Sequence, residues 1–186
     1  MIEFSIKGLA VIPEFVSAAD ENQLLTRIDE GEWGTELKRR VQHFGYRYLY
    51  SSKRVAPLPA APLPLWARQI LSKLRERRIV SQSFDQLIVN EYYPGQGVAP
   101  HIDSLLCFDN EIVSLSLGSS CVMVFSRKSD SARFELLLRP RDLLVMRNDA
   151  RYLWRHEIAP RQSDRWEGRV IGRTRRLSLT FRKLLT

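Results

Sequence analysis

Short apolar segments with strand periodicity fill the second half of the chain, and they constrain the fold more than any other feature. Within Glu111–Leu117, apolar residues alternate strictly with serines, the pattern of a strand with one buried face. Gly-Ser, Arg-Pro and Asn-Asp turn signals separate the segments. The other candidate strands are Phe84–Tyr93, Cys121–Phe125, Phe134–Leu138, Leu143–Met146 and Tyr152–His156. So many short strands predict a double-sheet jelly roll, or double-stranded β-helix.

Two helices are predicted before these strands. One begins after Ser17, where Asp20 completes a capping box, and the other covers residues 65–78. We expect an α+β fold that is mostly β, with both helices packed on one sheet. At 186 residues, the chain is predicted to be one domain. Residues 1–82 would hold the helices and a substrate lid, and residues 83–186 the catalytic jelly roll.

The segment Asn90–Ser104 carries a candidate metal site. His101 and Asp103 are two positions apart, so on extended backbone their side chains share a face. Imidazole and carboxylate suit first-row metals, and two histidines with one carboxylate form the facial triad of non-haem Fe(II) oxygenases. The third ligand would be His43 or His156. Alone, the pair is more often a hydrogen-bonded structural contact.

The last predicted strand has two arginines on one face. Arg176 and Arg182 share that face with serine and threonine, while leucine and phenylalanine fill the other. Buried guanidinium groups need partners, since an unpaired buried charge is very costly. Internal carboxylates or a dicarboxylate ligand would both satisfy them.

The net charge of the chain indicates which kind of binding partner to expect. The chain has 29 basic and 21 acidic residues, a formal charge of +8, which favours nucleic acid or an anionic membrane surface. Two cysteines form no disulfide framework, and no apolar run approaches the ~20 residues of a membrane span. We expect an intracellular, cytoplasmic monomer without a membrane segment; a nuclear or organellar location stays open.

Aromatic and basic residues alternate near residue 45. Phe44, Tyr46, Tyr48 and Tyr50 would form one row of rings if they lay on a single strand, beside Arg39 and Arg40. Such a row is equally typical of a core-facing strand edge. As a functional site, it predicts base stacking with phosphate contacts. A basic segment, residues 157–174, would form the opposite wall.

Taken together, these motifs resemble the AlkB family of Fe(II)/2-oxoglutarate dioxygenases. The resemblance rests on Asn90-x-Tyr92, His101-x-Asp103, a distal His156, and the arginines of the last strand. It is strongest to the tRNA-modifying branch, through Arg39–Tyr46, Tyr92–Gly97, Glu111–Gly118 and Arg151–His156. It covers residues 35–185.

The resemblance implies roles for seven residues. His101, Asp103 and His156 would bind Fe(II). Arg176 and Tyr92 would hold the distal carboxylate of 2-oxoglutarate, and Asn90 and Arg182 would lie around its metal-chelating end. O2 would convert the cosubstrate to succinate and CO2 while a substrate C–H bond is hydroxylated.

The resemblance leaves several activities open. We expect oxidative demethylation of alkylated DNA or RNA bases, because the methyltransferase domain of the metazoan tRNA-modifying relatives is absent from this sequence. The alternatives are hydroxylation of a tRNA wobble-uridine side chain, a protein-directed or small-molecule oxygenase, and a silent basic module that binds nucleic acid.

Overall fold

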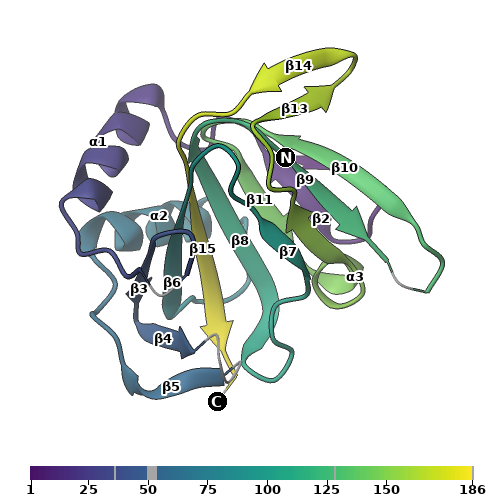
Figure 1. The fold of residues 1–186 in the computed structure, drawn as a ribbon. Helices are drawn as coiled ribbons and strands as arrows, with labels where there is room; N and C mark the ends of the chain where they lie inside the picture. Colours follow the sequence, from purple (N-terminus) through teal and green to yellow (C-terminus); the bar gives the residue numbers. More distant parts are fainter. Residues whose placement is uncertain (36, 50–53, 128, 186) are drawn as a thin grey trace.

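A computed structural model describes residues 1–35, 37–49, 54–127 and 129–185, and of residues 54–59 only the backbone. Two sheets face each other, with helices outside one of them (Figure 1). The larger sheet has seven antiparallel strands in the order β1-β2-β11-β8-β15-β6-β3. Their bounds are β1 Ile2–Glu3, β2 Leu9–Ile12, β3 Val41–Phe44, β6 Gln86–Tyr92, β8 Phe108–Gly118, β11 Leu143–Met146 and β15 Arg176–Leu184.

The smaller sheet closes the barrel, in the order β10-β9-β12-β7. Its strands are β7 Val98–His101, β9 Cys121–Ser126, β10 Arg133–Leu138 and β12 Arg155–Ile158. Apolar side chains from both sheets, among them Ile112, Phe125 and Leu144, pack between them in one cluster. This mostly β arrangement confirms the predicted jelly roll.

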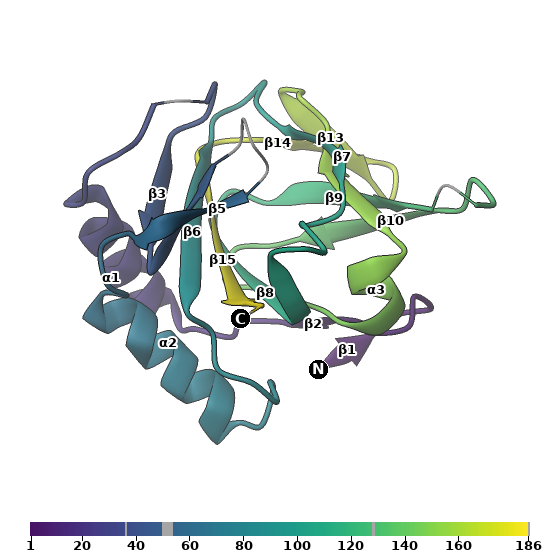
Figure 2. The ribbon, with the colours of Figure 1, turned by 90° about the horizontal axis from the view of Figure 1, so that it is seen from below.

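The helices cover the outer face of the larger sheet (Figure 2). They are α1 Ala18–Asp29 and α2 Leu65–Glu76, and a short α3 Asn148–Tyr152 precedes β12. The predicted capping box is present, because Ser17 and Asp20 exchange side-chain-to-backbone hydrogen bonds. Leu24, Ile28 and Ile70 pack against outward-facing leucines of β6, β8 and β15. The apolar face of β15 therefore meets the helices, and its polar face points into the barrel.

The N-terminal part does more than supply helices. Its strands β1, β2 and β3 extend the larger sheet at both edges. The division into a lid and a catalytic unit stays a prediction. Among the described residues, no helix is long and apolar enough to cross a membrane.

The single aromatic row predicted across residues 44–50 is wrong, and Gly45 is the reason. Gly45 has φ +76°, a left-handed conformation that favours glycine. It divides the segment into β3, which pairs with β6, and β4 (Tyr46–Leu49), which pairs with β5 (Arg54–Pro59). Phe44 therefore packs against Trp66 of α2, while Tyr48 turns to the barrel mouth. Tyr50 lies outside the described residues.

Replacement of Gly45 is expected to destabilise the protein by more than about 3 kcal/mol, at the upper end for point mutations. An added Cβ would lie 1.8 Å from the carbonyl oxygen of Asp85. Gly168→Ala is the matched control, because Gly168 has the same φ of +76° with no atom within 4 Å of the added Cβ. Urea unfolding should show a loss of about 1–2 kcal/mol for the control, from the backbone conformation alone. Equal losses in both variants would contradict the proposed clash.

The basic segment 157–174 is a hairpin rather than a loop. It contains β13 (Ser163–Trp166) and β14 (Arg169–Gly172). Trp166 and Ile171 pack on Val122 and Val124 of the smaller sheet. Apolar contacts at Trp166 and Ile171 thus fix the hairpin on the outer face of that sheet.

Candidate functional site

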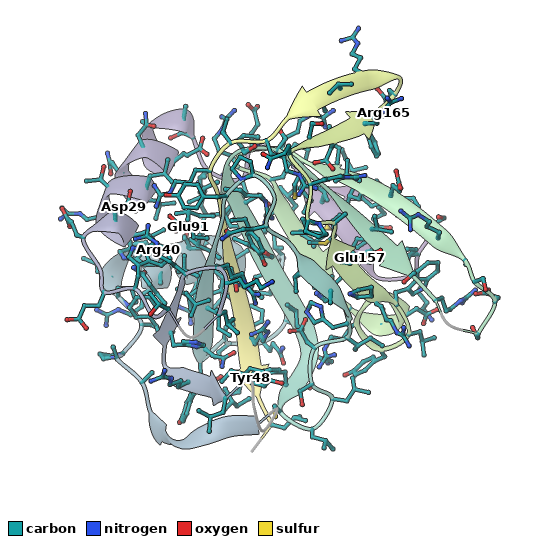
Figure 3. The ribbon with its side chains drawn as sticks, viewed as in Figure 1. Asp29, Arg40, Tyr48, Glu91, Glu157 and Arg165 are labelled. Atoms are coloured by element: carbon teal, nitrogen blue, oxygen red, sulfur yellow. The ribbon has the colours of Figure 1, made fainter. Side chains whose placement is uncertain are left out.

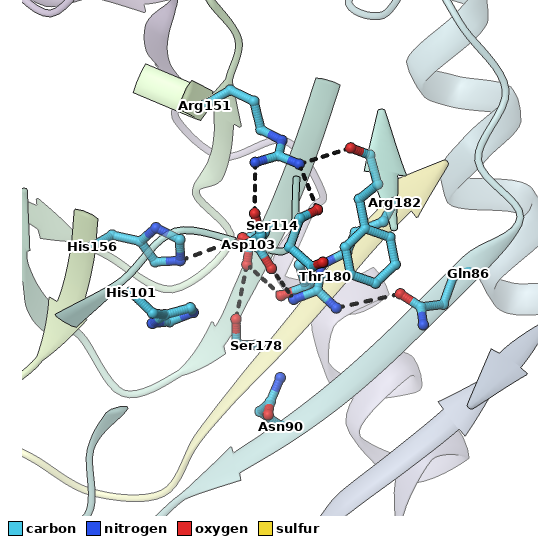
Figure 4. Close-up of polar contacts among 12 residues, drawn as sticks. Gln86, Asn90, His101, Asp103, Ser114, Arg151, His156, Ser178, Thr180 and Arg182 are labelled. Atoms are coloured by element: carbon cyan, nitrogen blue, oxygen red, sulfur yellow. Dashed lines mark hydrogen bonds and ion pairs between the residues drawn. The ribbon is translucent and has the colours of Figure 1, made fainter. Parts of the chain in front are cut away.

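His101, Asp103 and His156 converge inside the barrel (Figure 4). Each offers one ligand atom, and these atoms lie within 4.8 Å of one another. His101 and His156 are cross-strand partners on β7 and β12, with ring centroids 4.3 Å apart. Ligands at about 2.1 Å from one metal can be at most roughly 4.2 Å apart, so small side-chain shifts would suffice. His43 is not in this group.

The Asp103 carboxylate is fixed by Arg182. Arg182 Nη2 lies 2.6 Å from Asp103 Oδ1, and Oδ2 lies 3.6 Å from His156 Nε2. Burial alone would raise the pKa of Asp103, but the nearby positive charge, Arg182 above all, holds it well below its usual range. The carboxylate is therefore ionised at neutral pH, with one oxygen facing the histidines.

The histidines are prepared to act as neutral ligands. Burial, followed by the neighbouring His101, lowers the pKa of His156 to about 3. The Ala99 carbonyl lies 2.8 Å from His101 Nδ1, which favours a proton on Nδ1 and leaves Nε2 free for a metal. Two neutral imidazoles and one carboxylate form a donor set that suits Fe(II).

A cavity of about 580 Å³ opens over these three residues. This size is within the range of small-molecule sites, roughly 300–1,000 Å³. Its wall includes Asn90, Tyr92 and Arg182, and its rim includes Lys38 and Tyr48. No residue of β13 or β14 lines this cavity, but Ile158, near the start of the segment 157–174, does. The opposite wall formed by residues 157–174 stays a prediction.

Arg176 is buried and incompletely satisfied. It is 3% exposed, and its Nη2 donates to Ser116 Oγ at 2.8 Å. Nε and Nη1 have no hydrogen-bond partner among the described residues. Its guanidinium lies 5.6 Å from the Tyr92 ring centroid. Arg176 borders a separate small cavity beside Tyr92 rather than the main one, so a carboxylate touching both residues would sit where the two cavities meet.

Arg39 belongs to the wall of the cavity. Its Nε donates to Asn90 Oδ1 at 2.8 Å, and its guanidinium lies 5.6 Å from the Tyr92 ring. Arg39 is thus engaged with two residues predicted to bind 2-oxoglutarate. This contact argues against its predicted role as a phosphate ligand.

Arg40 is part of an ion-pair network. It donates two hydrogen bonds to Glu91, at 2.5 and 2.8 Å, and Glu91 also accepts one from Arg175. Arg175 in turn pairs with Asp29 of α1. Figure 3 shows Asp29, Arg40 and Glu91 together on the helical side. This network joins the helix to the sheet through Arg175 and Glu91, and the phosphate contact of Arg40 stays a prediction.

Among the described aromatic residues predicted to contact substrate, only Tyr48 lines the cavity. Its ring lies 5.7 Å from that of Phe108. Phe44 contributes to the helix-facing core, and Tyr46 is half-buried beside β5.

Sequence reasoning missed three residues that shape the site. Gln86 accepts a hydrogen bond from Arg182 at 3.3 Å, and Ser116 holds Arg176. Arg151 is buried against the segment after Asp103. Only Ser116 had a sequence signal, since it alternates with apolar residues on a predicted strand.

The fold and the site together define an iron-dependent oxygenase. Residues 8–182 match the family model of the 2OG-Fe(II) oxygenase superfamily, and the chain belongs to that superfamily. Its members use Fe(II), 2-oxoglutarate and O2. The known structure of OsALKBH1 has a similar fold, with a TM-score of 0.74 at 18% identity over 98% of this chain and 100% of that one.

More closely related sequences are AlkB-type proteins. An "alkylated DNA repair protein ALKBH8 homolog" of Arabidopsis thaliana is 37% identical over 98% of this chain. The mouse protein named tRNA (carboxymethyluridine(34)-5-O)-methyltransferase ALKBH8 is 38% identical over 95% of it. A DNA N6-methyl adenine demethylase of Caenorhabditis elegans is 27% identical over 96%. The chain spans 60%, 30% and 60% of these relatives, respectively.

Proposed function

We propose that His101, Asp103 and His156 bind Fe(II), and that Arg176 and Tyr92 hold the distal carboxylate of 2-oxoglutarate. A buried arginine whose Nε and Nη1 lack partners among the described residues still has N–H donors for a carboxylate, to which arginine forms strong charge-assisted hydrogen bonds. With the metal and O2, the cosubstrate supplies the oxidant for a substrate C–H bond. Arg182 keeps the Asp103 carboxylate ionised, and burial keeps the His156 imidazole neutral.

Arg182 has a separate role in this proposal. Its pairing with Asp103 turns one carboxylate oxygen away from the histidines and leaves the other toward them. A remaining guanidinium nitrogen, Nε, is buried without a hydrogen-bond partner among the described residues, and it would donate to the near end of the cosubstrate. Asn90, held by Arg39, borders the same space.

The proposed substrate is a modified base of tRNA, hydroxylated on its side chain. The observation that carries this choice is the higher identity to the mouse relative named for tRNA modification, 38%, than to the DNA demethylase, 27%. The basic composition, with a formal charge of +8, is consistent with a nucleic acid. The base would have to leave its stack to reach the cavity.

Oxidative demethylation of DNA or RNA is the second candidate. It uses the same geometry, because hydroxylation of an N-methyl group releases formaldehyde, whereas hydroxylation of a carbon substituent leaves the oxygen on the base. The match to a demethylase over nearly the whole chain supports it. The two candidate reactions therefore use the same proposed site residues and differ in their products.

One experiment separates these candidates. Pure protein is incubated with Fe(II), 2-oxoglutarate and either bulk tRNA or methylated oligonucleotides, and the nucleosides are analysed by mass spectrometry. A tRNA nucleoside that gains one oxygen atom without formaldehyde release supports the first candidate. Loss of a methyl group with formaldehyde supports the second. No change in any nucleic acid, alongside uncoupled succinate formation, would redirect the search to protein or small-molecule substrates.

Tyr48 and Lys38 are expected to contribute to RNA binding at the rim. A stacked base is worth roughly 1–3 kcal/mol, so Tyr48→Ala should weaken binding of single-stranded RNA by about 5-fold or more. Lys38→Ala should reduce both the affinity and its salt dependence. Fluorescence anisotropy at two salt concentrations measures both effects. Arg165→Ala is the control, because Arg165 projects from the hairpin away from the cavity (Figure 3). A stronger loss in Arg165→Ala than in Lys38→Ala would place the RNA elsewhere.

A further inference from the structure

Arg151 is a large buried side chain that has no acidic hydrogen-bond partner in the described part of the chain. The residue is 2% exposed, and burial lowers the pKa of its guanidinium below the usual value. Its hydrogen bonds go to four backbone carbonyl oxygens, at distances of 2.8–3.1 Å; these belong to Asp103, Ser104, Phe108 and Asp109. The buried cation is therefore hydrogen-bonded by peptide carbonyls, which must all four point inward, while the charge of Asp103 acts on it without a direct hydrogen bond.

These four carbonyls belong to the segment that carries Asp103. It leaves β7 after His101, turns at residues 105–107, and enters β8 at Phe108. Two backbone hydrogen bonds also hold this turn: the Phe108 N–H donates to the Ser104 carbonyl at 3.2 Å, and the Leu185 N–H donates to the Cys107 carbonyl at 3.0 Å. The Arg151 guanidinium adds contacts to both ends of the turn, at the Ser104 and Phe108 carbonyls.

Because of its position in the chain, Arg151 also connects the turn after Asp103 to the strand that carries His156. Arg151 lies in α3, immediately before β12, which carries His156. One side chain therefore connects the segment of Asp103 to the segment of His156. Arg182 holds the Asp103 carboxylate from β15, while Arg151 holds the Asp103 carbonyl from α3 (Figure 4).

We propose that Arg151 is a positioning residue for the metal site, which sets the distance between Asp103 and His156 by fixing the turn after Asp103. The inference rests on the proposed metal triad and on no assumption about the substrate. Outer-shell partners of metal ligands typically change metal affinity by roughly 10- to 100-fold when they are removed. Lysine at this position keeps the charge but cannot reach four carbonyls at once, because it has no planar fork.

The test compares Arg151→Lys with Arg173→Lys in the full chain. Arg173 is also buried, at 8%, and binds Asp164 and the Ala159 carbonyl at the base of the hairpin, so it controls for the general loss of a buried arginine. The probes are Mn(II) binding by electron paramagnetic resonance, the ligand-field spectrum of the Co(II) form, and amide hydrogen exchange of residues 104–110.

In Arg151→Lys we expect Mn(II) binding to weaken about 10- to 100-fold, the Co(II) spectrum to shift, and the amides to exchange faster. Arg173→Lys should lower the unfolding midpoint and leave metal binding and the Co(II) spectrum unchanged. Wild-type Mn(II) affinity in Arg151→Lys, or equal losses in both variants, would overturn the inference. If the wild-type protein itself binds no Mn(II), the proposed triad fails instead, so the two failures are distinguishable.

Discussion

His101→Ala, Asp103→Asn and His156→Ala are each expected to abolish 2-oxoglutarate turnover and to weaken Mn(II) binding by more than about 100-fold, beyond the loss of an outer-shell partner. Each variant removes one of three donors that lie within 4.8 Å of one another. Asparagine is preferred at position 103, because alanine would leave buried Arg182 without its partner, and breaking a buried ion pair costs about 3–5 kcal/mol. Asparagine keeps the shape of the side chain and removes its charge.

His43→Gln is the matched control for the triad. It removes the third histidine of the chain, which lies on β3 outside the group. The sequence alone allowed either His43 or His156 as the third ligand. Isothermal titration with Mn(II) and succinate formation should be normal in His43→Gln and lost in His156→Ala. The reverse result would refute the assignment of His156.

The sequence predicted most of the fold, because its signals were local. Strict alternation in Glu111–Leu117 corresponds to the middle of β8, and the Ser17–Asp20 capping box marks the start of α1. The i, i+2 spacing of His101 and Asp103 placed both side chains correctly on the same side of the barrel. Periodicity and spacing suffice where a single strand or helix end decides the geometry.

Interactions over long sequence distances could not be predicted in this way. The sequence did not mark Glu91 as the partner of Arg40, because Glu91 lies on another strand and the β3–β6 register brings the two together. The prediction of a single aromatic row was wrong because of Gly45. Its positive φ changes the direction of the backbone, so the rings before and after it face different layers of the fold. Arg151 binds carbonyl groups, which every residue carries, so no residue type in the sequence marks its partners.

Arg176→Ala is expected to raise the 2-oxoglutarate concentration needed for half-maximal turnover by roughly 30-fold or more, since truncating one member of a buried charge pair costs about 2–5 kcal/mol. Arg176→Lys should recover only part of this loss, because an ammonium group cannot form two parallel hydrogen bonds to a carboxylate. Uncoupled succinate formation measures the effect without a nucleic-acid substrate. A normal 2-oxoglutarate requirement in Arg176→Ala would refute the assignment.

Stability measurements give this prediction an independent readout. Arg176 has two buried nitrogens that lack hydrogen-bond partners among the described residues, so its removal should cost the ligand-free protein little stability. A ligand that binds only the folded state raises stability in proportion to the logarithm of its concentration over Kd. Thermal unfolding with Mn(II) and increasing 2-oxoglutarate should therefore show a large shift for the wild-type protein and a small one for Arg176→Ala. Equal shifts of the unfolding temperature in both proteins would mean that the cosubstrate carboxylate binds elsewhere. A large loss of stability in ligand-free Arg176→Ala would mean that the bond to Ser116 stabilises the fold and does not serve the cosubstrate.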